Sequence, residues 1–159
     1  MSGDPVYRRN IYIAAPAQMV WQALVTPTIV SQYFLCPLQW LELEVGGEMF
    51  YGSNGRRFID AFILELEPGE RLVHSFSMLL YLHEDAAYEP PTRVTYELFP
   101  LDKMCLLELK HDGFTAANQF FQDVCEAWET VLSGLKTVVE TGQTMPWPKQ
   151  RRLPLPVAA

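Results

Sequence analysis

The stretch NQFFQDVCEAWETVLSGLKTVVET, residues 118–141, decides the fold. Its apolar residues recur at steps of three and four, which predicts one long helix with a single apolar face. Gly142 follows the stretch and can end the helix in a left-handed conformation. An apolar face of this length has to be covered, and the preceding residues predict a sheet that covers it. The face comprises Phe121, Val124, Trp128, Leu132, Leu135 and Val139.

Residues 38–110 predict that sheet, because apolar and polar side chains alternate there between turn signals. The strongest signal is Asn54-Gly55, since both central residues of a type I′ turn need a positive φ. This region predicts an antiparallel meander of about six strands.

A first strand is predicted at residues 7–13, ahead of the meander. Pro16 and the pair Thr26-Pro27 then begin two short helices, because a proline costs least at the first helical position. The predicted fold class is α+β: a seven-stranded curved antiparallel sheet wrapped round a long C-terminal helix, with two short helices after the first strand.

Charge divides the chain into two parts. Residues 1–143, which we interpret as one domain, hold 9 Lys and Arg against 19 Asp and Glu. Residues 144–159 hold three basic residues, no acid and four prolines, and we interpret them as an extended tail. An acidic body lacks the clustered basic side chains that bind polyanions, so DNA and RNA are not expected partners.

The three cysteines show no paired spacing, and no secretory signal segment precedes the first strand. We therefore expect a cytoplasmic protein, and apolar runs are too short to predict a membrane span. The three histidines show no metal-ligand spacing, and phosphate-binding and nucleophile motifs are absent. We expect no metal and no cofactor. His111-Asp112 could form an acid–base pair, but a hydrogen-bonded turn is the interpretation that we favour.

Strand parity predicts which side chains face the long helix. If charged residues such as Glu65, Glu97 and Glu108 face water, their neighbours line the concave face. Aromatic rings are frequent there and polar groups are few, which is typical of small-molecule sites. The predicted ligand cavity comprises Phe62, Leu64, His74, Phe76, Tyr96, Leu98, Leu107, Leu109, Phe121, Val124, Cys125, Trp128 and Leu132.

The side chains on the opposite face of the sheet predict a protein partner. Trp40, Ile59, Ile63 and Val73 fall on the outward face, where a solvated sheet should be polar. We therefore expect a homodimer. The irregular segment 79–92 is predicted to rim the mouth of the cavity.

Several segments resemble the START-like, helix-grip (SRPBCC) superfamily, and within it the proteins related to the activator of the ninety-kilodalton heat-shock-protein ATPase. The resemblance extends over residues 7–142 and implies the helix-grip fold, on which carriers, receptors, cyclases and chaperone cofactors all occur. The segments are IAAPAQMVWQAL (13–24), TPTIVSQYF (26–34), VGGEM (45–49), ILELEPGERLVHSF (63–76), LELKHDGF (107–114) and AWETVLSGLKTVVETG (127–142).

These sequence features are compatible with three functions. The leading hypothesis is reversible binding of a hydrophobic small molecule or lipid beneath the long helix. The second, implied by the resemblance, is a module that stimulates a chaperone ATPase. The third is a cofactor-independent cyclase or hydrolase using His74, Tyr96 or Asp60, which would need a titratable pair inside the cavity.

Overall fold

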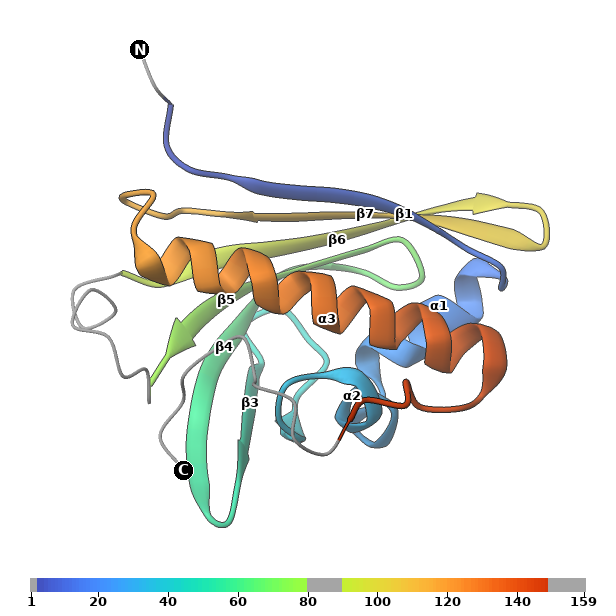
Figure 1. The fold of residues 1–159 in the computed structure, drawn as a ribbon, viewed down its shortest axis with the longest axis horizontal. Helices are drawn as coiled ribbons and strands as arrows, with labels where there is room; N and C mark the ends of the chain where they lie inside the picture. The colour runs from blue at the N-terminus through green and yellow to red at the C-terminus, as the bar shows by residue number, and fades with distance from the viewer. Residues whose placement is uncertain (1–2, 80–89, 149–159) are drawn as a thin grey trace.

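The computed structural model describes residues 3–79 and 90–148, and these form one curved antiparallel sheet and three helices (Figure 1). The seven strands lie in the spatial order β1-β7-β6-β5-β4-β3-β2. This is the predicted helix-grip architecture. The elements are β1 (Tyr7–Ile13), α1 (Ala17–Val25), α2 (Pro27–Tyr33), β2 (Leu38–Leu41), β3 (Glu48–Ser53), β4 (Arg56–Glu67), β5 (Arg71–Met78), β6 (Thr92–Leu101), β7 (Met104–Asp112) and α3 (Gln119–Thr141).

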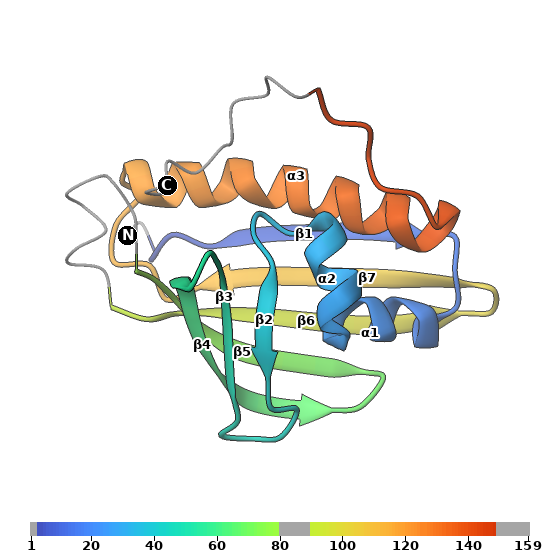
Figure 2. The ribbon, with the colours of Figure 1, turned by 90° about the horizontal axis from the view of Figure 1, so that it is seen from below.

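The sheet and α3 form two layers. Helix α3 runs the length of the sheet, while α1 and α2 lie beside its C-terminal half (Figures 1 and 2). We call the sheet face toward α3 the inner face and the other the outer face. The core lies between the inner face and α3, and α2 packs against α3. Within the described residues, no helix is both long enough and apolar enough to cross a membrane.

Local sequence accounts for the ends of several elements. Asn54 and Gly55 both have positive φ, as the predicted hairpin turn between β3 and β4 requires. The Asn118 side chain accepts a hydrogen bond from the Phe121 amide and so caps the start of α3. Gly142 ends α3 with a φ of 72°, as predicted.

A β-bulge in β4 reverses the side-chain alternation within that strand. Ile63 pairs with His74 of β5, but Glu65 pairs with Val73, so Leu64 is an extra residue without an opposite partner. After the bulge, Glu65 faces outward as predicted. On the N-terminal side of the bulge, side chains with the same parity as Glu65 face inward, because one extra residue exchanges the two faces of the strand.

The bulge makes part of the predicted parity wrong. Phe62 and Leu64 are 51% and 46% exposed on the outer face, so they do not line the inner face. Ile59 and Ile63 are each 1% exposed and belong to the core. Val73 does lie on the outer face, but it is also only 1% exposed. These three residues therefore cannot supply a surface for a dimer.

Trp40 lies on the outer face opposite Phe50, and its side chain is about half exposed. The predicted mouth segment 79–92 falls mostly on residues 80–89, which lie outside the described residues.

Candidate functional site

The candidate site lies between the N-terminal half of α3 and the inner face of the sheet. A gap of about 10 Å³ remains there, which is roughly the room that one water needs. Its walls are almost entirely apolar. They are Phe34, Leu35, Phe76, Val124, Ala127, Trp128 and Val131.

Aromatic rings close this gap from the side of α2. The ring of Phe34 stacks on Tyr51 with centroids 4.4 Å apart, and it meets Trp128 edge-on at 6.3 Å. Phe34 belongs to the segment that joins α2 to β2, and it is only partly buried. The gap is thus bounded on one side by a connecting segment and on the others by α3 and the sheet.

A buried chain of hydrogen bonds fixes one wall. The Trp128 indole N–H donates to Nδ1 of His111 at 3.0 Å, and Nε2 of His111 lies 2.7 Å from the Thr92 hydroxyl. The Thr92 hydroxyl in turn donates to the carbonyl of Phe76. An indole can only donate, so Nδ1 accepts and Nε2 carries the proton of the neutral imidazole. Both ring nitrogens of His111 are therefore occupied.

His74 differs from His111 in having one free nitrogen. Its Nδ1 lies 2.7 Å from the carbonyl of Ser75, so Nδ1 carries the proton and donates. Nε2 is then an acceptor. Among the described residues, it is the one buried side-chain nitrogen or oxygen that lacks a hydrogen-bond partner. The ring lies 5.9 Å from that of Tyr96, on the inner face.

Burial keeps both histidines uncharged. Desolvation lowers the pKa of His74 to about 4 and that of His111 to about 3. Burial also raises the pKa of Tyr96, Tyr33 and Tyr51, so these phenols stay protonated. These two histidines and three tyrosines therefore offer neutral hydrogen-bonding groups to the interior.

Comparison with models of protein families gives a match. The family model described as "Activator of Hsp90 ATPase homolog 1-like protein" matches residues 14–140, most of the chain. The chain belongs to this family. Among curated protein sequences, no match was found.

Solved structures share the fold. DynU16, a protein in the dynemicin biosynthetic locus, superposes with a TM-score of 0.73 at 20% identity over 89% of this chain. This chain spans 49% of DynU16, about half its length. The Aha1 dimer from Colwellia psychrerythraea gives a TM-score of 0.70 at 18% identity over 87% of this chain and 98% of that one. An Hsp90 activator from Plasmodium falciparum gives 0.68 at 15% identity over 86% and 96%.

Most of the predicted cavity residues of this family member lie on the inner face or on α3. Only three of them, Phe76, Val124 and Trp128, line the gap itself. Phe62 and Leu64 lie on the other side of the sheet. The remaining predicted residues are packed in or against the core without lining the gap: His74, Tyr96, Leu98, Leu107, Leu109, Phe121, Cys125 and Leu132.

Four lining residues were not predicted. Ala127 and Val131 lie on α3 one helical turn apart, and Ala127 is small enough to leave the space that the gap occupies. Phe34 and Leu35 come after α2, where no periodicity marks an inward side chain. The one available signal was the placement of two large apolar residues directly before Cys36-Pro37.

The carboxylates that could have served as acid–base partners point elsewhere. Asp60 lies on the outer face in an ion pair with Arg57, so it is not beside His74 and Tyr96. Asp112 pairs with Arg93, and this guanidinium lowers the pKa of the Asp112 carboxyl. Within residues 3–79 and 90–148, no group of three or more His, Cys, Asp or Glu side chains could hold a metal ion.

Proposed function

We propose that this protein reversibly binds a small, mainly apolar molecule between α3 and the inner face of the sheet, and that this molecule carries one hydrogen-bond donor. A hydrophobic metabolite or a lipid with a hydroxyl or amide group would meet this description. The observation that carries the proposal is the free, buried Nε2 of His74 within an otherwise apolar and aromatic interior.

The chemistry of His74 defines the donor. A buried acceptor without a partner costs about 1–3 kcal/mol, so a ligand that satisfies it gains in affinity. Nε2 accepts because Nδ1 donates to Ser75, and the lowered pKa keeps the ring neutral at physiological pH. An N–H or O–H group therefore fits this position better than a carboxylate or an ether.

Binding also requires the gap to open, since about 10 Å³ does not admit an organic molecule. Of the walls of the gap, the segment Phe34–Pro37 should move at the lowest free-energy cost, because it is irregular and only partly buried. Outward movement of the Phe34 ring would enlarge the gap by the volume that this ring now fills between Tyr51 and Trp128. The proposal thus includes a ligand-dependent displacement of Phe34.

A pair of isosteric probes tests the donor requirement. Indole and benzofuran have nearly the same size and shape, but only indole carries an N–H donor. We expect indole to bind the full chain about 2–12 times more tightly than benzofuran, as one net hydrogen bond of about 0.5–1.5 kcal/mol implies. Isothermal titration calorimetry measures both affinities.

His74→Leu is the informative variant, because leucine is close to histidine in volume and cannot accept a hydrogen bond. In this variant the preference for indole should disappear, whereas Trp40→Leu on the outer face should retain it. Native mass spectrometry of the purified protein searches for the natural ligand. If neither probe binds and no apolar compound is found with the protein, the proposal fails.

A second candidate is stimulation of a chaperone ATPase, which family membership favours. A surface for it is available on the outer face of β2–β4, where Trp40, Phe62 and Leu64 expose about half of their side chains. We call these three residues the outer apolar patch. The test is the ATPase rate of a ninety-kilodalton heat-shock protein with and without this chain. An unchanged rate removes this candidate.

The outer apolar patch is also where we propose the homodimer contact, since Ile59 and Ile63 are in the core. Exposed apolar side chains of this kind commonly mark a protein contact. Light scattering tests this proposal separately from ligand binding.

A further inference from the structure

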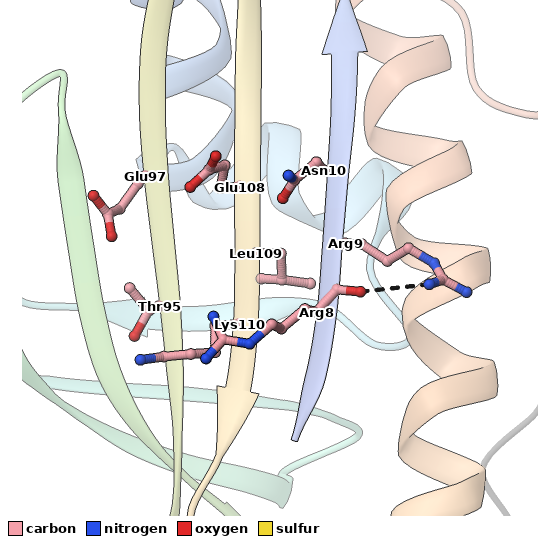
Figure 3. A pocket seen from close by; sticks show the side chains of 8 residues that line it. All are labelled: Arg8, Arg9, Asn10, Thr95, Glu97, Glu108, Leu109 and Lys110. Atoms are coloured by element: carbon pink, nitrogen blue, oxygen red, sulfur yellow. Dashed lines mark hydrogen bonds between the residues drawn. The ribbon is translucent and has the colours of Figure 1, made fainter. Parts of the chain in front are cut away.

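The outer face of β1, β7 and β6 carries two rows of charged side chains of opposite sign. Arg8 of β1 lies opposite Lys110 of β7, and we call these two residues the cationic row. Two residues further along β1, Asn10 lies opposite Glu108, which itself lies opposite Glu97 of β6. We call Glu97 and Glu108 the acidic row. Both rows line a surface groove of about 600 Å³ (Figure 3).

The acidic row is only partly neutralised. Glu97 accepts a hydrogen bond from Arg71 at 2.6 Å, but no ion pair involving Glu108 occurs in the described part of the chain. Like charges directly opposite each other on neighbouring strands destabilise a sheet. Figure 3 shows the Glu97 and Glu108 side chains next to each other on the same face. A positively charged group of a ligand would relieve this repulsion.

The cationic row has the same imbalance with the opposite sign. Lys110 lies 3.7 Å from a carboxylate oxygen of Asp112, whereas the ion pairs among the described residues do not include Arg8. Figure 3 shows both cationic side chains extending over β7 toward Thr95 of β6. Thr95 is only 4% exposed although it lies on the outer face, as expected where long side chains lie flat over it. A negatively charged group would bind at this end of the groove.

Apolar side chains follow on the other side of the acidic row. Tyr12, Leu106 and Phe99 lie opposite one another on β1, β7 and β6, and Met104 and Leu101 form the next row. Tyr12 is 57% exposed, and Phe99, Leu101 and Met104 are each exposed by 40% or more. We call these five residues the hairpin apolar rows. Along the strands, the outer face therefore changes in the order apolar, acidic, cationic.

We propose that this groove binds a small amphipathic zwitterion in which a positive charge lies between an apolar chain and a terminal negative charge. The chain lies on the hairpin apolar rows, the positive group contacts the acidic row, and the negative group contacts the cationic row. An N-alkylated amino acid has this order of groups. Residues two apart on a strand are separated by about 6.7 Å, so the two charges of the ligand should be separated by a similar distance.

The order of the rows disfavours the headgroups of phosphocholine and phosphoethanolamine lipids. In these lipids the phosphate lies next to the apolar chains and the ammonium group is terminal. With its chains on the hairpin apolar rows, such a lipid would place its phosphate on the acidic row and its ammonium group on the cationic row. Both contacts would be repulsive, and like charges brought together in this way discriminate against the wrong ligand.

Two octyl detergents with the same charges in opposite order test the proposal. Octyl sulfobetaine has the order chain, ammonium, sulfonate, whereas octylphosphocholine has the order chain, phosphate, ammonium. Amide chemical shifts of the full chain, recorded below the micelle concentrations, locate both detergents and give their affinities. We expect saturable shifts at Tyr12, Leu106 and Phe99, with octyl sulfobetaine bound at least about twofold more tightly, as two surface ion pairs imply. Absence of binding at these amides, or equal or tighter binding of octylphosphocholine, would overturn the proposal.

Exchange of the two charges without ion pairs tests the role of the rows. Arg8→Glu/Glu108→Arg gives each row one charge of either sign, so the sheet should stay stable and the preference for octyl sulfobetaine should disappear. Glu44→Arg is the matched control, because Glu44 is an exposed acid in the loop between β2 and β3. Glu44→Arg should retain the preference, and so should His74→Leu, since His74 lies in the interior. A preference that survives the exchange, or that Glu44→Arg also removes, would show that the rows do not read the order of charges.

Discussion

The indole N–H of Trp128 donates a hydrogen bond of 3.0 Å to Nδ1 of His111, which links the middle of α3 to the last strand of the sheet. Both residues are buried, and the hydrogen bonds continue through Thr92 to the carbonyl of Phe76. A buried polar chain of this kind orients its members, because any other arrangement leaves a donor or acceptor without a partner. This chain of hydrogen bonds positions Trp128, whose side chain lines the candidate site.

Trp128→Phe should lower the free energy of unfolding by about 1–3 kcal/mol, because Nδ1 of His111 then loses its donor while most of the packing stays. Trp128→Ala also empties a large aromatic site and should cost about 3–5 kcal/mol. Urea unfolding measures both. Trp40→Phe is the control, since Trp40 is half exposed, and it should change stability by less than about 0.5 kcal/mol. Equal effects of Trp128→Phe and Trp40→Phe would contradict the structural role of the indole N–H.

Stability should fall in mild acid because of the two buried histidines. In the unfolded chain they bind protons below about pH 6.5. In the folded chain the pKa of His74 is lowered to about 4 and that of His111 to about 3. The unfolded state therefore binds more protons between pH 6.5 and 4, and the free energy of unfolding decreases as the pH falls through this range.

His74→Leu separates the two contributions. It should reduce the pH dependence by up to about 1.4 kcal/mol per pH unit between pH 6 and 4.5, because one proton fewer is taken up on unfolding. Urea midpoints at several pH values test this. A variant with the same pH dependence as the natural chain would show that His74 can be protonated in the folded state.

Gly134 allows α2 and α3 to approach closely. A Cβ at this position would lie 3.1 Å from Cβ of Tyr33. Tyr33 cannot easily move, because its hydroxyl donates to the carbonyl of Ala23 and its side chain is buried. Gly134→Ala should therefore cost about 1–3 kcal/mol, although alanine favours helix. Ser133→Ala on the exposed side of α3 is the control and should be nearly neutral in thermal or urea unfolding.

Oligomeric state tests the outer apolar patch. We expect a dimer at micromolar concentration, and Phe62→Asp should shift it toward monomer because a carboxylate would be buried at the contact. Multi-angle light scattering measures the mass. Phe99→Asp, at an exposed phenylalanine on the hairpin apolar rows, should leave the dimer intact. A monomer for the natural chain would refute the dimer. Equal effects of the two variants would show that the contact does not lie on the outer apolar patch.

Periodicity and turn chemistry were enough to predict the fold. The predicted bounds of β1 are those observed, and Asn54-Gly55 and Gly142 have the predicted positive φ. These features depend on residues close together in the sequence. The family resemblance read from segments between residues 7 and 142 is likewise confirmed by the family match.

The candidate site was less predictable, because it depends on cross-strand register. The faces of the other β4 side chains were predicted by alternation from Glu65, which does face water. The bulge at Leu64 makes this prediction wrong for Phe62 and Ile63. No residue type in that strand marks the bulge. Likewise, whether His74 or His111 has a free nitrogen is decided by partners more than 15 residues away, such as Thr92 and Trp128.

The bulge has a consequence for changes in chain length. If Leu64 were deleted, Ile63 would still lie opposite His74 and Glu65 opposite Val73, now in uninterrupted register. Deletion of one residue between Ile59 and Ile63, where β4 pairs with β3 without a register shift, would instead move core side chains to the surface. Leu64 is thus a position in this strand at which the protein can lose a residue and still keep the inward side chains of β4 inward.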